Sequence, residues 1–111
     1  MNVIAKSGVL LMLVAGFMVG QTALAKQARC FTSDDGEYLC EFKNTDNKGS
    51  FEVSAPGKPT MILVIDAPGV AYGWADFGTG RNVSLPGKYL RQDADKACWL
   101  NDETNAKICV W

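Results

Sequence analysis

The segment that most constrains the fold is residues 59–78, the most apolar part of the chain outside its first 25 residues. Residues 61–65 read Met-Ile-Leu-Val-Ile, an unbroken aliphatic run that lies between Pro59 and Pro68. A run this short is typical of a strand rather than a helix, and its lack of alternation indicates burial on both faces. The sequence therefore predicts a β-sheet with this strand at its centre.

Regular turn signals cut the rest of the chain into short segments. Pro-Gly pairs at residues 56–57, 68–69 and 86–87 have the pattern of type II turns. Because the twist of a type II turn splays a two-residue hairpin, we expect corners there, where the chain passes between sheets. The expected strands are residues 28–33, 37–43, 50–54, 60–66, 70–77, 81–85, 88–91, 97–100 and 106–110. This pattern predicts an all-β domain, a small disulfide-stabilised antiparallel sandwich or partly open barrel of about eight strands.

The first 25 residues have the pattern of a cleavable secretory signal. They contain one cation, Lys6, an apolar stretch over residues 8–20, and Ala-Leu-Ala at residues 23–25 as a cleavage site. The apolar stretch is shorter than the roughly 20 residues that a membrane span needs. We therefore expect cleavage near Ala25, a single mature domain of residues 26–111 without a membrane span, and a periplasmic or secreted location.

Four cysteines in a small exported domain indicate two disulfides that supplement a modest core. Cys30 and Cys40 lie symmetrically about the hairpin signal Asp-Asp-Gly at residues 34–36. A register centred on this turn places Arg29 opposite Glu41, an attractive cross-strand pair. The sequence therefore predicts a Cys30–Cys40 disulfide within one hairpin.

Cys98 and Cys109 flank the polar run of residues 101–105 in the same way. This spacing predicts a second hairpin with its own disulfide. The nested pairing, Cys30 with Cys109 and Cys40 with Cys98, stays open at this point because spacing alone does not decide connectivity.

Charge and histidine content argue against several function classes. Loss of Lys6 with the leader changes the net charge from −1 to about −2, which indicates no basic surface for nucleic acid or membranes. The chain has no histidine, so an imidazole base and imidazole metal ligands are excluded. Oxidised cysteines exclude thiol chemistry as well. We therefore expect no enzyme activity, no cofactor, no metal site and no nucleic-acid partner.

Carboxylates are the remaining candidates for catalysis, as an acid and base pair of the kind that glycosidases use. The candidates by residue type are Asp66, Asp76, Asp93, Asp95 and Asp102. All lie near expected turns or strand ends, where a solvated carboxylate is the ordinary case. A small hydrolase is therefore a minor hypothesis beside a binding protein.

Aromatic residues give the clearest sign of a binding surface. In the strand expected over residues 70–77, alternation puts Tyr72 and Trp74 on one face and the small residues Ala71, Gly73 and Ala75 on the other. If the small face packs inward, the two aromatic rings point outward and form a platform for a sugar ring or a protein side chain. If the bulky face is inward, both rings belong to the core.

Tyr89 and Arg91 form a second candidate group, because they share one face of an expected strand. Tyrosine and arginine are enriched in binding hot spots. Arg81 joins them as another arginine without an assigned partner, and Trp99 as a further stacking surface. The structural alternative is that both arginines form ion pairs with neighbouring aspartates.

The chain also shows an ordered set of features: Tyr-Leu-Cys at residues 38–40, Val-Ser-Leu-Pro at residues 83–86, then Tyr89 and Trp99. This order resembles the small β-barrel inhibitors of c-type lysozyme found in bacterial envelopes. The resemblance covers most of the mature domain and implies inhibition of an envelope hydrolase. The Ser-Gly-x-Arg-Tyr stretch that such inhibitors present to the enzyme is absent, and Pro-Gly-Lys-Tyr stands at residues 86–89 instead.

These observations predict a small exported binding protein of the cell envelope that is not an enzyme and that binds a protein partner. Inhibition of lysozyme or another envelope hydrolase is one alternative. Carbohydrate binding through exposed aromatic residues is another, and a structural envelope protein without a dedicated ligand is the third.

Overall fold

The computed structural model describes residues 25–111, so the expected leader, apart from Ala25, lies outside the described residues. The described chain forms nine antiparallel strands and no helix. They are β2 (Ala25–Thr32), β3 (Gly36–Asn44), β4 (Phe51–Ser54), β5 (Thr60–Ala67), β6 (Val70–Asp76), β7 (Val83–Ser84), β8 (Tyr89–Arg91), β9 (Cys98–Asn101) and β10 (Lys107–Val110). Each strand expected from the sequence is present, with ends shifted by a few residues at most. Within residues 25–111, no helix could span a membrane.

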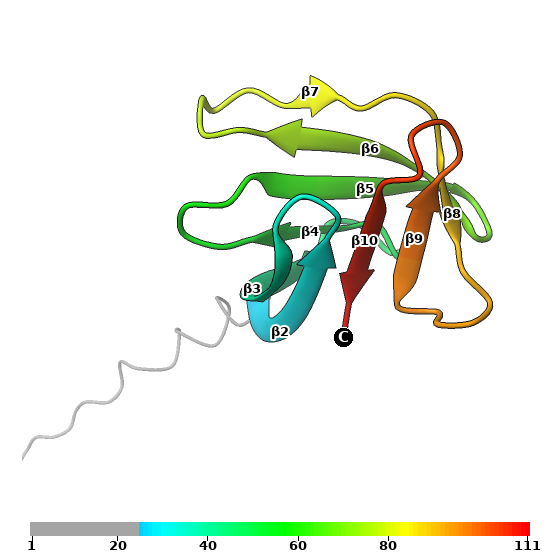
Figure 1. The fold of residues 1–111 in the computed structure, drawn as a ribbon, viewed down its shortest axis with the longest axis horizontal. Helices are drawn as coiled ribbons and strands as arrows, with labels where there is room; N and C mark the ends of the chain where they lie inside the picture. Colours follow the sequence, from blue (N-terminus) through cyan, green and yellow to red (C-terminus); the bar gives the residue numbers. More distant parts are fainter. Residues whose placement is uncertain (1–24) are drawn as a thin grey trace, which may run out of the picture.

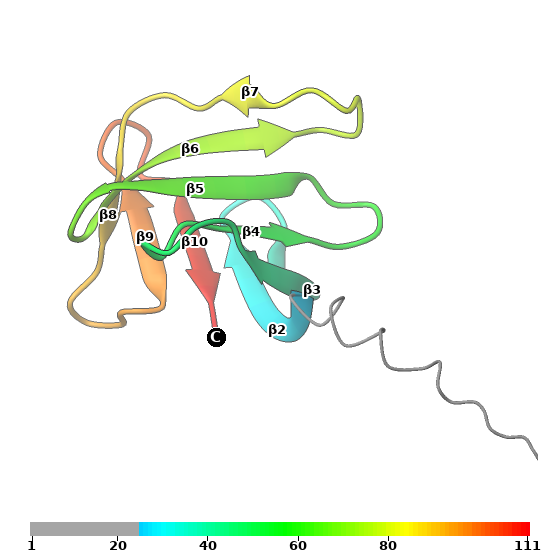
Figure 2. The same cartoon turned by 180° about the vertical axis from the view of Figure 1, so that it is seen from behind.

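Eight of the strands close into a barrel (Figure 1). The ring runs β5, β4, β3, β2, β10, β9, β8, β6, and β6 pairs again with β5. Figure 2 shows β5 and β6 side by side along their length, with β7 next to β6 as an additional strand. The prediction of an all-β, disulfide-stabilised domain is therefore confirmed. Of its two forms the chain adopts the barrel, which is closed rather than partly open.

Two of the three Pro-Gly sites are hairpin turns, not corners. Residues 56–57 lie between the paired strands β4 and β5, and residues 68–69 connect β5 to β6 with Ala67 opposite Val70. The β5–β6 ladder shifts register between Ile65 and Ala67. Such a bulge increases local twist, which offsets the poor match between a type II turn and a two-residue hairpin. Residues 86–87 form a corner between β7 and β8, but both strands pair with β6 in one sheet, so the predicted passage between two sheets does not occur there either.

Asn101 fixes the corner at residues 86–87 from inside the barrel. Its side chain is fully buried, and its amide nitrogen donates to the carbonyl oxygen of Pro86 at 2.7 Å. Its amide oxygen accepts from the N–H groups of Glu103 and Thr104 at 2.8 and 2.9 Å. A buried amide that is satisfied on both sides stabilises a single geometry. This one side chain therefore fixes the corner and the β9–β10 turn together.

Both predicted disulfides are present: Cys30 joins Cys40, and Cys98 joins Cys109. The nested alternative is therefore excluded. In the second hairpin Cys98 lies directly opposite Cys109, as the sequence predicts. Each disulfide joins two strands that follow one another in the chain.

The register of the first hairpin differs from the prediction by two residues. Cys30 lies opposite Tyr38, and Arg29 lies opposite Leu39 instead of Glu41. The cause is the turn, which is centred on residue 34 because the Thr32 hydroxyl accepts a hydrogen bond from the N–H of residue 35 at 3.1 Å. The predicted ion pair with Glu41 is therefore wrong, and the Arg29 guanidinium instead lies 3.9 Å from a Glu37 carboxylate oxygen.

The small face of β6 points into the barrel. Ala71, Gly73 and Ala75 are buried, whereas Tyr72 and Trp74 are on the outer face. Of the two orientations left open by the sequence, the outward one is therefore correct for the aromatic residues. A Cβ atom on Gly73 would lie only 2.6 Å from the ring of Tyr89, so the small face makes room for this ring inside the barrel.

Strand β5 is not buried on both faces as the sequence predicts. Leu63 points inward and is fully buried, but Val64 is 38% exposed and Ile62 is only partly covered. The reason is that the sheet closes on itself, so within residues 25–111 no second layer covers its outer surface. The apolar run therefore supplies both the core and an exposed outer surface.

We expect Gly73→Ala to lower the free energy of unfolding by about 1 to 3 kcal/mol, because the added methyl overpacks the barrel against Tyr89. Denaturant titration measures the loss. In a Tyr89→Leu background the same substitution should cost less, since the nearest ring atoms are gone. An equal cost in both backgrounds would show that the contact with Tyr89 is not the cause.

Candidate functional site

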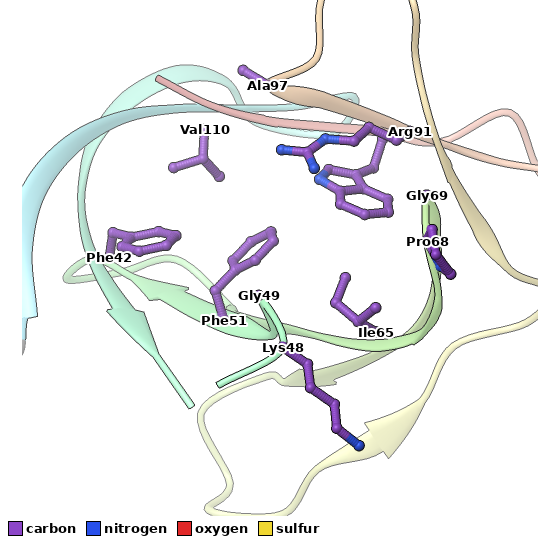
Figure 3. A pocket seen from close by; sticks show the side chains of 11 residues that line it. Phe42, Lys48, Gly49, Phe51, Ile65, Pro68, Gly69, Arg91, Ala97 and Val110 are labelled. Carbon is purple, nitrogen blue, oxygen red and sulfur yellow. The ribbon is translucent and has the colours of Figure 1, made fainter. Parts of the chain in front are cut away.

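One end of the barrel is open and forms a cavity of about 400 Å³, here called the cup (Figure 3). Its volume lies near the lower end of the range of roughly 300 to 1,000 Å³ found for ligand pockets. The residues that line it are Phe42, Lys48, Gly49, Phe51, Ile65, Pro68, Gly69, Arg91, Ala97, Trp99 and Val110. They come from six strands and three connecting loops, so the closed barrel itself builds the site.

The walls of the cup are apolar and largely aromatic. Phe42 and Phe51 lie on the neighbouring strands β3 and β4, with ring centroids 5.4 Å apart and ring planes 28° apart. Figure 3 shows their rings and the side chain of Val110 pointing into the cavity. Trp99 completes the wall from β9 and is only 3% exposed. These side chains share the inward face with the Cys30–Cys40 disulfide, so the floor of the cup is continuous with the core.

Arg91 lies at the rim with its side chain fixed in place. Its guanidinium carbon is 5.2 Å from the centroid of the Trp99 ring, within the range of a cation–π contact. Its Nε–H donates to the carbonyl oxygen of Lys96 at 2.7 Å, and its backbone N–H donates to that of Gly69 at 2.9 Å. Within residues 25–111 the two terminal nitrogens of Arg91 have neither a hydrogen bond nor an ion pair. The guanidinium is therefore oriented and still able to bind a ligand.

The loop that carries Lys48 is fixed by a carboxylate. One oxygen of Asp46 accepts from the N–H of Lys48 at 2.7 Å and from that of Ser50 at 3.0 Å. The pKa of Asp46 is lowered, first by hydrogen bonding from the Ser50 side chain and then by the Lys48 N–H. The Ser50 hydroxyl also accepts from the N–H of Ile65 at 2.8 Å, which attaches the loop to β5. In Figure 3 the Lys48 side chain leads away from the cavity, so its charge lies on the rim.

The charges around the cup are of one sign. Lys48 and Arg91 are the charged residues among those that line it, and no carboxylate is among them. An apolar cavity bordered by unpaired cations attracts anions, and the field is strengthened by the low dielectric of the walls. The cup is therefore suited to a ligand that combines an apolar part with negative charge.

The opposite end of the barrel is more completely filled. Its cavity measures about 160 Å³, and Tyr89 and Asn101 help to line it. Tyr89 is 3% exposed, and its pKa is raised chiefly because burial disfavours the phenolate. The expectation that Tyr89 forms a binding surface with Arg91 is therefore wrong, because the ring of Tyr89 is buried. Both share the inward face, but Tyr89 fills the interior, whereas Arg91 lies at the rim.

The other predicted binding residues are dispersed. Tyr72 is 39% exposed on the outer face, with the Lys88 ammonium 5.9 Å from its ring centroid, and Trp74 is half-buried on the same face. Arg81 lies in an exposed loop, where its backbone N–H donates to Thr79. Trp99 is a wall of the cup rather than an open stacking surface. Of the predicted binding residues, Arg91 and Trp99 are therefore the two that meet at the cup.

The predicted ion pairs between these arginines and neighbouring aspartates are not formed. Asp93 lies 3.8 Å from the ammonium of Lys96, and Asp76 accepts three backbone hydrogen bonds within its own turn. Asp95 accepts from the N–H of Ala97, and Asp102 from that of Lys88. Within residues 25–111 no group of three or more possible metal-ligating side chains lies together. These aspartates mainly cap turns.

Sequence reasoning missed Phe42, Phe51, Lys48 and Val110. One signal for Phe42 was available, because it lies two residues from Cys40 and must share the inward face of its strand. Which residues meet at one end of a barrel depends on the stagger between strands, and that stagger follows from pairings between distant strands. The cup could therefore not be assembled from local patterns.

We expect Asp46→Ala to move the amide resonances of Lys48 and Ser50, because both N–H groups lose their acceptor. Since the folded-state pKa of Asp46 lies below 3.8, its carboxylate stabilises the loop above that pH and loses this effect as the pH falls through the lowered value. The wild-type amides should therefore shift in the same direction on acidification below 3.8. Asp66→Ala is the exposed control, and equal shifts in both variants would contradict this role of Asp46.

The function of this barrel has to be inferred from its own residues. The cup offers an apolar cavity with a fixed guanidinium, and the outer face offers a partly exposed aromatic strand. No protein-family model matches the chain, and no curated protein or solved structure is significantly similar to it.

Proposed function

We propose that this chain is a small non-enzymatic binding protein and that it binds its ligand in the cup. The observation that carries the proposal is an open cavity of about 400 Å³ on a rigid, closed barrel. Barrels of eight strands have an interior that side chains can just fill or that can hold one small ligand. Here Tyr89 and the Cys30–Cys40 disulfide fill the interior, whereas the end next to Phe42 and Val110 stays open.

The use of the carboxylates supports a binding role over catalysis. An acid and base pair needs two carboxylates that face one another across a substrate site. In this barrel no carboxylate lines the cup, and Asp46, Asp76 and Asp95 accept backbone hydrogen bonds in turns. What the cup offers is shape, apolar surface and positive charge, which are the elements of recognition.

The two disulfides are compatible with an oxidising extracellular environment, where such bonds persist. The export of the chain to the periplasm or the medium, with cleavage near Ala25, belongs to the proposal. In that setting the ligand is a molecule of the cell envelope or its surroundings. A fixed barrel needs little rearrangement to bind it, which limits the entropic cost of association.

The neutral fluorescent dye N-phenyl-1-naphthylamine tests the site. We expect the oxidised protein to enhance its emission and Val110→Phe to weaken its binding by roughly tenfold, or about 1.4 kcal/mol. The reason is that Val110 points into the cup, so a larger ring occupies the space of the dye. Fluorescence titration measures the affinity.

The matched control is Val83→Phe, the same exchange on the exposed strand β7. It should bind the dye as the wild type does. Equal affinity of the two variants, or no binding by the wild-type protein, would contradict the proposal that the cup is the binding site.

Protein binding through the outer face is a second candidate function. The observation in its favour is that Tyr72 points outward, with Val64 and Leu90 also more than a third exposed on neighbouring strands. Apolar side chains gathered on one surface often mark an interaction site. This face, rather than the cup, would serve a protein partner such as a c-type lysozyme.

We expect Tyr72→Ala to weaken inhibition of c-type lysozyme by roughly tenfold or more if this second function holds, since exposed tyrosines are frequent hot spots. Phe77→Ala is the control, because Phe77 is 59% exposed outside β6. A lytic assay on bacterial cell walls measures the inhibition. An absence of inhibition by the wild-type protein would exclude c-type lysozyme as its partner.

A further inference from the structure

We infer that the ligand of the cup is a small amphiphile whose acidic group binds Arg91 and whose apolar or aromatic body lies against Phe42, Phe51 and Val110. This inference rests on the proposed function, because it names the chemical class that the cup accepts. It adds a specific role for the guanidinium of Arg91, namely recognition of a carboxylate or a similar anion.

The first argument is the distribution of ion pairs. Three cations of residues 25–111 form ion pairs, Arg29 with Glu37, Lys58 with Asp35 and Lys96 with Asp93, whereas Lys26, Lys43, Arg81, Lys88 and Lys107 form none. Arg91 and Lys48, the cations of the cup, also form no ion pair within the same residues. No protein carboxylate is therefore paired with either cation of the cup, and an anionic ligand can take that place.

The second argument is the orientation of Arg91. The Nε–H bond to the Lys96 carbonyl oxygen and the contact with the Trp99 ring fix the plane of the guanidinium. Its terminal nitrogens are left without a hydrogen-bond partner among the described residues. A planar guanidinium with a free edge matches the two oxygens of a carboxylate. Figure 3 shows this group reaching over the cavity from the rim.

Lys48 has a weaker and less specific role. Its backbone is fixed through Asp46, but its side chain leads away from the cavity. A flexible ammonium on the rim adds to the positive potential, and salt screens this contribution. The geometry therefore assigns recognition of the acid to Arg91 and a general attraction of anions to Lys48.

The third argument is the nature of the walls. Phe42 and Phe51 present neighbouring rings, and Val110 and Ile65 add aliphatic surface. A hydrophilic anion such as inorganic phosphate would leave these walls in contact with water and gain only the charge interaction. A molecule with an apolar body uses both the walls and the guanidinium, and the volume of about 400 Å³ limits it to a small one.

Two probes that differ only in charge test the inference. 1-Naphthylacetate and 1-naphthylacetamide share one aromatic body, and only the first carries a carboxylate at pH 7. Each is titrated against the protein loaded with N-phenyl-1-naphthylamine, and loss of dye emission reports displacement. We expect the acid to displace the dye at roughly tenfold lower concentration than the amide, and this ratio to fall with added salt.

Substitutions then locate the source of the preference. Arg91→Gln should remove most of the preference for the acid, because the guanidinium is gone and only the weaker attraction by Lys48 is left. Arg91→Lys keeps the charge without the planar fork, so it should retain only part of the preference for the acid over the amide. Lys48→Gln should also retain only part of this preference, because it lowers the positive potential at the rim. Arg81→Gln is the matched control in an exposed loop and should keep the full ratio.

The outcomes separate the inference from the proposed function. If the dye binds but acid and amide displace it equally, or if both Arg91 variants keep the full preference, the inference is overturned and the cup remains a binding site. If the wild-type protein binds neither dye nor acid, the proposed function fails too. Near-ultraviolet circular dichroism shows whether each variant keeps its fold, and Arg91→Lys preserves the test if Arg91→Gln does not fold.

Discussion

The pairing of β5 with β6 is the interaction on which the rest of the structure depends, because it closes the sheet into a barrel. The Pro-Gly turn at residues 68–69 and the register shift before Ala67 allow the two strands to pair along their length. Once the sheet is closed, each strand has one face toward a narrow interior and one toward solvent. The depth of the cup and the exposure of the outer aromatic residues both follow from this closure.

Much of the fold could be predicted from the sequence, because turns and disulfides leave local signals. Pro-Gly and Asp-Gly pairs marked the ends of the strands, and the spacing of Cys98 and Cys109 gave the register of the last hairpin. The first hairpin shows the limit of this approach. Its turn is centred one residue earlier than its cysteines indicate, because the Thr32 hydroxyl binds the turn backbone.

Less of the candidate site could be predicted, since it depends on contacts between distant strands. Arg91 and Trp99 were identified by residue type, and the barrel does bring them together. Tyr89 was assigned to a surface because alternation cannot distinguish the filled interior of a barrel from its open end. Gly73 decides this point, since only a residue without a side chain lets the tyrosine ring pack against β6.

Both disulfides are local, and this has a consequence for how the barrel opens. Cys30–Cys40 has a sequence separation of ten residues and Cys98–Cys109 one of eleven, so each disulfide links the two strands of a single hairpin. The seam between β2 and β10, where the first and last described strands meet, has no covalent link. The fully oxidised chain can therefore separate there by breaking only hydrogen bonds and side-chain packing. Oxidation protects the two hairpins, whereas the integrity of the ring depends on noncovalent contacts alone.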